Sequence, residues 1–300
     1  MRPTLIVGSI AFDTLHLSGK CHSKVLGGAA TYASLAAAHF APVQLVGVVG
    51  HDFPDSAIKL LKDRGVDLAG LEVARGETFH WEGRYSEDLS SRETLRTDLN
   101  VFADFKPKIP QSFRAAPYVM LGNIDPVLQH EVLDQIDKPA FVLADTMNLW
   151  IDIRHSELQK LCARIDMLVL NDEEARQLTD EKNLVLAAKA LQALGPKHVC
   201  IKKGEHGALL FQGDEVFALP ALPLSKVVDP TGAGDTFAGA LIGYLARGGD
   251  LSSTSLRRAL VHGSVLASFC VEGVGTERLA AASPSEIHGR VEGFRQLTSF

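Results

Sequence analysis

Short apolar segments rich in β-branched residues alternate with segments of helical length through most of this chain of 300 residues. The alternation predicts a parallel sheet with helices on both faces, because each parallel strand needs a crossover to reach the next. The predicted strands are residues 5–7, 43–49, 118–121, 140–143, 167–170 and 198–201. The predicted helices are residues 31–40, 55–63, 126–136, 156–163, 172–178, 184–194, 235–247, 256–271 and 285–297. The fold class is therefore α/β, with a parallel central sheet flanked by helices.

Residues 73–100 depart from this rhythm. Apolar or small side chains alternate there with polar ones, which is the two-residue period of a half-exposed strand: Phe79, Trp81, Gly83 and Tyr85 against Thr78, His80, Glu82 and Arg84. We expect a small β-lid inserted into one unit that spans residues 1–300, with residues 14–25 pairing with the lid. The alternative is a surface hairpin without function that closes a sheet edge.

Composition favours a soluble globular protein with a small-molecule ligand. The net charge of −6 lacks the basic excess that would attract nucleic acid or an anionic membrane. The first apolar run is too short for a signal peptide and ends at Asp13, which favours a buried strand. No apolar run approaches the roughly 18 residues of a membrane span. The four cysteines are far apart, which is typical of a reducing cytoplasm: Cys21, Cys162, Cys200 and Cys270.

In the segment 228–240, VDPTGAGDTFAGA, small and flexible residues come directly before a predicted apolar helix. Backbone N–H groups at such a helix start converge on one point and favour an anion such as phosphate. Asp235 lies beside this site, where a carboxylate can accept a proton from a substrate hydroxyl. The alternative is an aspartate that only caps the helix.

The stretch DPTGAGDTFAGAL resembles the signature of the ribokinase-like (PfkB) carbohydrate kinase family. Further pieces follow in family order along nearly the whole chain. They are Gly8-Ser9-Ile10-Ala11-Phe12-Asp13, Gly27-Gly28-Ala29-Ala30, Asn171-Asp172-Glu173-Glu174, Ile201-Lys202-Lys203-Gly204-Glu205-His206-Gly207 and Glu272-Gly273-Val274-Gly275. The resemblance implies the ribokinase-like fold and phosphoryl transfer from ATP to an alcohol.

The resemblance also implies a role for each matching residue. Asp235 would be the catalytic base, and the amides of Gly232, Ala233 and Gly234 would form an anion hole. The acceptor would be bound by Asp13, Gly27, Gly28 and Tyr32, and the nucleotide by Lys202, Gly204 and Gly275. Asn171 and Glu174 would hold Mg²⁺ through water, and Asp229 a monovalent cation such as K⁺.

Three of these roles have structural alternatives. Asn171 and Glu174 have the spacing of a capping box at a helix start. Lys202 and Lys203 could be a solvated lysine pair at a strand end. Asp229 could fix the Asp-Pro turn.

The match departs from ribose kinases at two positions, where Ala11 and Tyr32 replace asparagines of those enzymes. A buried sugar would lose hydrogen-bond partners there, whereas Tyr32 and the lid aromatics offer flat faces to a base or ring. Lid arginines Arg84, Arg92 and Arg96 could meet a phosphorylated substrate, but solvated arginines are the simpler account.

We therefore expect an ATP- and Mg²⁺-dependent kinase of a sugar or related small polyol. A nucleoside kinase is the alternative within the enzyme class, and a non-catalytic sugar-binding or regulatory protein on the same fold is the alternative outside it. The acceptor and the oligomeric state, including a homodimer through the lid, remain open.

Overall fold

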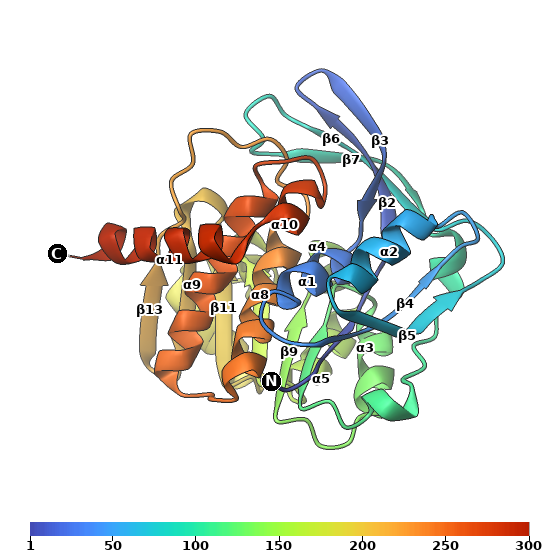
Figure 1. Ribbon diagram of the computed structural model, residues 1–300. Helices are drawn as coiled ribbons and strands as arrows, with labels where there is room; N and C mark the ends of the chain where they lie inside the picture. Colours follow the sequence, from blue (N-terminus) through green and yellow to red (C-terminus); the bar gives the residue numbers. More distant parts are fainter. Residues whose placement is uncertain (300) are drawn as a thin grey trace.

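The computed structural model describes residues 1–299. In this part of the chain a nine-stranded sheet forms the centre, in the order β13-β12-β11-β10-β9-β8-β1-β4-β5 (Figure 1). Its strands are β1 (Thr4–Val7), β4 (Val43–Val49), β5 (Val66–Val73), β8 (Tyr118–Leu121), β9 (Phe141–Asp145), β10 (Met167–Asn171), β11 (His198–Lys202), β12 (Ala208–Gln212) and β13 (Glu215–Leu219). The strands from β5 to β11 are parallel, and β12 and β13 continue the sheet antiparallel.

Helices cover both faces of this sheet, and each face has its own hydrophobic core. One core contains residues of α1 (Ala29–Ala37), α2 (Asp55–Asp63), α8 (Ala233–Gly248), α9 (Ser253–Cys270), α10 (Glu277–Ala281) and α11 (Pro284–Thr298). The other contains residues of α3 (Pro126–Leu133), α4 (Asn148–Ile153), α5 (His155–Cys162), α6 (Asp172–Thr179) and α7 (Leu184–Ala193). No helix within residues 1–299 is long and apolar enough to cross a membrane.

Helices α1 and α8 contact each other through their backbones. A Cβ atom on Gly239 would lie 2.3 Å from the carbonyl oxygen of Ala33, and one on Gly243 would lie 2.7 Å from the Cα atom of Ala37. The pairing runs in the same direction along both helices, so both start at the same end of the sheet. The two helix starts are thereby held at a fixed separation.

The alternation of strand and helix predicted from the sequence is confirmed, and two features of the sheet differ from it. The β12–β13 hairpin was not predicted, and it makes the central sheet mixed instead of purely parallel. Its two-residue turn, Gly213-Asp214, separates two apolar runs and is a hairpin signal. Strand β5 was also not predicted, because it lies at the sheet edge and only some of its side chains are buried.

A second sheet of four strands stands off one end of the large sheet (Figure 1). Its order is β3-β2-β6-β7, from β2 (Ala11–Leu17), β3 (Lys20–Gly27), β6 (Phe79–Tyr85) and β7 (Arg92–Asp98). The predicted pairing of the two lid segments is confirmed, and it is parallel between β2 and β6. The predicted lid boundary at residue 73 is wrong, because Val73 belongs to β5 of the large sheet. We call this four-stranded sheet the lid.

Candidate active site

Three polar side chains end neighbouring parallel strands at one edge of the large sheet. Asp145 ends β9, Asn171 ends β10 and Lys202 ends β11, and Asn171 is the register partner of Lys202. The carboxyl ends of parallel strands are where α/β sheets bind ligands. Asp145 was not predicted as a site residue, although a buried apolar run that ends on a carboxylate is the same signal that Asn171 and Lys202 gave.

Lys202 and Asp145 form a buried ion pair. The Lys202 Nζ atom lies 3.3 Å from each carboxylate oxygen of Asp145, and the two side chains are only 17% and 5% exposed. The interpretation of Lys202 as a solvated lysine is therefore wrong. Its ammonium also lies beside Gly234, where a Cβ atom would come within 2.9 Å of Nζ. One positive charge is thus held against the start of α8.

The glycine-rich loop forms an uncapped helix start. Gly232 is the N-cap of α8 in the left-handed conformation, with φ of 75°, and no side chain caps the helix. The amides of Gly234 and Asp235 donate to no other residue within residues 1–299, whereas that of Ala233 donates to the Pro230 carbonyl oxygen. Two N–H groups without a partner and the positive end of the helix dipole therefore lie beside the ammonium of Lys202.

Asp235 occupies the third position of α8, beside these amides. Burial and the nearby carboxylate of Asp145 raise its pKa to about 7, and the positive charges of Lys202 and Arg92 partly oppose this rise. The side chain is not the N-cap, so helix capping does not explain Asp235. A carboxylate with a pKa near neutrality can exchange a proton with a substrate at physiological pH.

Asn171 and Glu174 form a complete capping box at the start of α6. The amide of Glu174 donates to Asn171 Oδ1 over 2.7 Å, and the amide of Asn171 donates to Glu174 Oε2 over 2.8 Å. Burial raises the pKa of Glu174 to about 7, with Lys202 opposing and Asp145 adding to the rise. The capping box expected as the structural alternative is therefore present. The Glu174 carboxylate that takes part in it also lies close to the charges of Lys202 and Asp145.

Asp13 on β2 and Gly27 on β3 are the residues by which the lid itself enters the site, next to Gly28. A Cβ atom on Gly27 would lie 2.0 Å from Asp13 Oδ2, so only glycine leaves room for this carboxylate. Gly28 has φ of 93° and begins α1 without a side-chain cap. Burial, followed by the charges of Asp229 and Asp235, raises the pKa of Asp13 to about 8.

Tyr32 lies beneath the glycine-rich loop. A Cβ atom on Gly232 would lie 2.4 Å from the Tyr32 ring, which is completely buried. The hydroxyl has no hydrogen-bond partner within residues 1–299. Stacking of an acceptor on Tyr32 is therefore not available in this conformation, because the ring supports the loop from below.

Asp229 joins two loops at the other side of the site. Its Oδ1 atom accepts the Thr231 amide and its Oδ2 atom accepts the Gly275 amide, both over 2.9 Å. The turn-fixing alternative for Asp229 is thus present in the structure. Gly275 also touches the lid, since a Cβ atom there would lie 2.2 Å from Val25 Cγ1. Gly204 lies in an exposed turn after β11, and a Cβ atom there would meet none of these residues within 4 Å.

The lid reaches the glycine-rich loop through Tyr85. The Tyr85 hydroxyl lies 2.9 Å from Thr231 Oγ1. On the same face of β6, the Trp81 ring covers Gly83, and Asp13 is the register partner of Trp81 on β2. Phe79 instead stacks on Phe102, so its role is packing.

Among the lid arginines, only Arg92 points its charge toward the site. Its guanidinium lies 5.7 Å from the Trp81 ring, and it opposes the rise in pKa that burial causes in Asp13 and Asp235. Arg84 and Arg96 pair with carboxylates of the lid itself, Glu93 and Asp98.

We expect Tyr85→Phe to weaken lid closure. Loss of the hydroxyl removes one hydrogen bond, worth about 1 kcal/mol, so KM for the acceptor should rise about fivefold with little change in KM for ATP. Thr231→Val should have the same effect, and the double variant should be no worse than either single one. Steady-state kinetics of the four proteins measures this coupling, and strictly additive effects would contradict a direct contact.

The family model of the pfkB family carbohydrate kinases matches residues 2–281. The chain belongs to this family. It is therefore a phosphotransferase that acts on a hydroxyl of a sugar or a nucleoside.

Individual kinases resemble the chain over most of its length. The cytidine kinase of Thermococcus kodakarensis is 30% identical over 254 residues, which cover 83% of this chain and 90% of that protein. The inositol 3-kinase of Arabidopsis thaliana is 25% identical over 294 residues, which cover 91% and 75%. The structure of an E. coli protein designated ribokinase II, in complex with ATP and Mg²⁺, shares the fold with a TM-score of 0.80, 19% identity, and coverage of 99% and 100%.

Proposed function

We propose that this pfkB family protein transfers the γ-phosphoryl group of ATP to a hydroxyl of a nucleoside. The observation that carries the chemistry is the position of Asp235 beside two free amides and the ammonium of Lys202. A base, anion donors and a positive charge at one point are the groups that phosphoryl transfer to an alcohol requires.

Asp235 would take the proton of the attacking hydroxyl. Its pKa of about 7 suits this role, because the carboxylate is ionised in a large share of molecules at neutral pH and is still basic. The neighbouring amides of Gly234 and Asp235 would donate to the phosphoryl oxygens as charge shifts onto them. Their positions are set by α8, so the donors need little rearrangement during the reaction.

Lys202 would add a positive charge to the same place. Its ion pair with Asp145 holds the ammonium beside Gly234 and keeps it charged, since the partner carboxylates oppose the effect of burial on its pKa. A lysine held in this way acts as a fixed charge toward phosphate. Asp145 is then a positioning residue for Lys202.

The residues near α6 fit Mg²⁺. Within residues 1–299, no three His, Cys, Asp or Glu side chains are close enough to hold a metal ion directly. The oxygens of Asn171 and Glu174 suit an ion that keeps several waters and takes few protein ligands, and these two residues would hold it through water. When bound, the ion neutralises charge on the phosphates of ATP. A K⁺ site at Asp229 and a homodimer through the lid stay predictions.

Two features near Asp13 support a nucleoside as the acceptor. The lid presents Trp81 across from Asp13, with Arg92 nearby, so a flat base could stack there while a hydroxyl faces the Asp13 carboxylate. Ala11, which is fully buried, supplies no hydrogen bond to a small sugar. The similarity to a cytidine kinase points the same way. A polyol acceptor is the second candidate, favoured by the similarity to an inositol kinase and by the buried Asp13 carboxylate.

An acceptor panel decides between these candidates. We expect cytidine or another nucleoside to exceed ribose and myo-inositol at least tenfold in kcat/KM, measured by ADP release and by ³¹P NMR of the product. Trp81→Ala should remove most of this preference, because a lost stacking contact is worth about 1 kcal/mol or more, and Trp81→Phe should retain it. Ribose or myo-inositol as the best acceptor would contradict the nucleoside assignment and leave the phosphoryl-transfer chemistry intact.

A further inference from the structure

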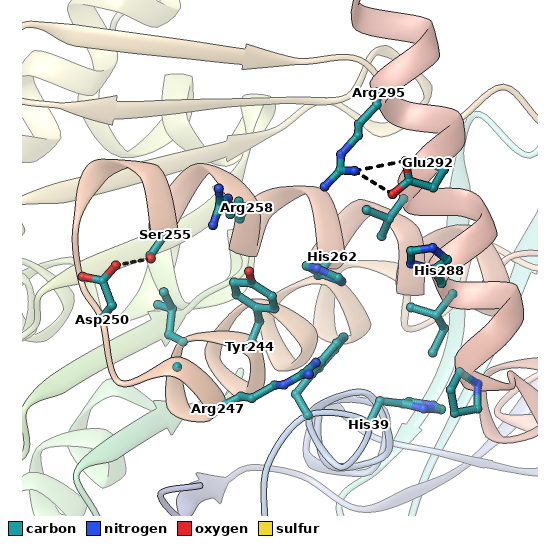
Figure 2. A pocket seen from close by; sticks show the side chains of 16 residues that line it. His39, Tyr244, Arg247, Asp250, Ser255, Arg258, His262, His288, Glu292 and Arg295 are labelled. Atoms are coloured by element: carbon teal, nitrogen blue, oxygen red, sulfur yellow. Dashed lines mark hydrogen bonds and ion pairs between the residues drawn. The ribbon is translucent and has the colours of Figure 1, made fainter.

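A cavity of about 630 Å³ lies away from the candidate active site (Figure 2). Its walls are the C-terminal end of α8, the first half of α9, and α11, together with His39 and Phe40 after α1. Arg247 on its wall is about 18 Å along the α8 axis from Asp235, at 1.5 Å per residue. The volume is in the range of small-molecule sites. No step proposed for the kinase uses these residues.

The cavity carries positive charge that the protein does not neutralise. Arg247 of α8 and Arg258 of α9 have no carboxylate within 4 Å in the described part of the chain. Of the two acidic groups that line the cavity, Glu292 pairs with Arg295 over 2.8 Å, and Asp250 accepts hydrogen bonds from Ser252 and Ser255. These hydrogen bonds, and to a smaller extent the charge of Arg258, lower the pKa of Asp250, so this carboxylate stays ionised. Three arginines and two carboxylates leave the cavity with a net positive charge, and within residues 1–299 neither Arg247 nor Arg258 is held in an ion pair that would keep it from an anion.

A flat aromatic wall stands next to these arginines. The rings of Tyr244 and His262 are stacked 4.3 Å apart at an interplanar angle of 20°, and Phe40 meets His262 edge-on at 5.2 Å. Ile287 and Val291 of α11 add an apolar side. Figure 2 shows His262 between Arg258 and His288, with Tyr244 beside it. The cavity thus joins a cationic part to an aromatic and apolar part.

The pKa of His262 depends on the charges around the cavity. Burial and the charge of Arg247 lower its pKa to about 4, so the ring is neutral at pH 7. Burial also lowers the pKa of His39. The third histidine on the wall, His288 of α11, is exposed. The positive charge that acts on the His262 ring is therefore that of Arg247.

We propose that this cavity is a second ligand site that binds a mononucleotide. The phosphate would lie between Arg247 and Arg258, and the base would pack against the wall formed by Tyr244 and His262. An inorganic anion would use only the first part, and an uncharged nucleoside only the second. A ligand with a phosphate joined to a flat ring uses both.

The test is a titration of CMP, cytidine and inorganic phosphate into the full-length protein. Binding is followed by calorimetry and by NMR of the His262 ring, assigned with His262→Gln. CMP is expected to raise the pKa of His262, because the phosphate adds negative charge beside it. Arg247→Gln and Arg258→Gln should each weaken this binding about tenfold, the loss expected for one charge-assisted contact. Arg257→Gln is the matched control, since Arg257 pairs with Glu215 instead of lining the cavity.

Three results would overturn the proposal. The first is CMP binding that leaves the pKa of His262 unchanged, which assigns CMP to the active site alone. The second is equal affinity in the Arg257→Gln and Arg258→Gln variants. The third is inorganic phosphate binding as tightly as CMP, which removes the base from the ligand. Because Arg247 and Arg258 are exposed, their variants should fold, and thermal unfolding verifies this.

Discussion

Asp235→Asn should lower kcat by about two to four orders of magnitude, the usual contribution of a positioned general base. The substitution keeps the shape and the start of α8, so the affinity for ATP, measured by calorimetry, should change less than about twofold. The protein should also remain folded at pH 8. The folded protein favours the protonated form of Asp235, because its pKa is about 7 in the fold against 3.8 in model compounds. The free energy of unfolding therefore decreases as the pH rises through the folded-state pKa and Asp235 ionises. A neutral asparagine avoids this cost.

The pH dependence gives a second measurement of the same role. In the unsubstituted enzyme kcat/KM should fall as the pH drops below about 7, because protonated Asp235 cannot accept the hydroxyl proton. Asp13, with a pKa of about 8, could add to this acid limb. The Asp13→Asn variant separates the two contributions. Its kcat/KM should be lower than that of the unsubstituted enzyme, but kcat/KM should still fall as the pH drops below about 7. Turnover by folded Asp235→Asn at the original rate would remove Asp235 from the mechanism.

Lys202→Met should damage both stability and catalysis. It leaves the Asp145 carboxylate buried without a partner, which costs about 3 kcal/mol in the free energy of unfolding. It also removes a fixed positive charge from the phosphate site, so kcat should fall about a hundredfold. The acid limb should move to higher pH, because Lys202 is the main group that opposes the rise in the pKa of Asp235.

Two further variants distinguish the effect of Lys202→Met on stability from its effect on kcat. Lys203→Met is the matched control, because the neighbouring lysine forms no ion pair within residues 1–299 and should change neither quantity. In the double variant Lys202→Met/Asp145→Asn the unpaired charge is gone, so stability should recover while kcat does not. Denaturant unfolding and steady-state kinetics measure the two effects. Recovery of kcat together with stability would mean that Lys202 serves only the fold.

The parts of the structure that follow from local chemistry could be predicted from the sequence. The glycine-rich loop needs φ above zero at Gly232 and leads into an apolar helix, so the uncapped helix start with Asp235 beside it was visible as a pattern. The alternation in β6 was equally readable, because a sheet with two different faces imposes a period of two.

The parts that depend on contacts between distant segments could not be predicted. Asp145 gains its importance only from Lys202, which is its partner across 57 positions of the chain. The sequence cannot show that the Tyr32 ring is completely buried against Gly232, because an aromatic side chain suits a buried position and an exposed stacking face equally well. Strand β5 lacked a clear pattern, since an edge strand of a covered sheet is neither fully buried nor regularly alternating.

The contact between α1 and α8 has a consequence for how this protein can change during evolution. The two helices meet backbone to backbone through Gly239 and Gly243, so the glycine-rich loop and the Gly28 turn are held together beside the large sheet. Trp81, Tyr85 and Arg92 belong to the separate four-stranded sheet. Under the proposed function, substitutions in that sheet would replace one acceptor by another without moving Gly234 and Asp235 on α8 or Lys202 on β11. Acceptor specificity could then diverge among related proteins while the groups proposed to transfer the phosphoryl group stay in place.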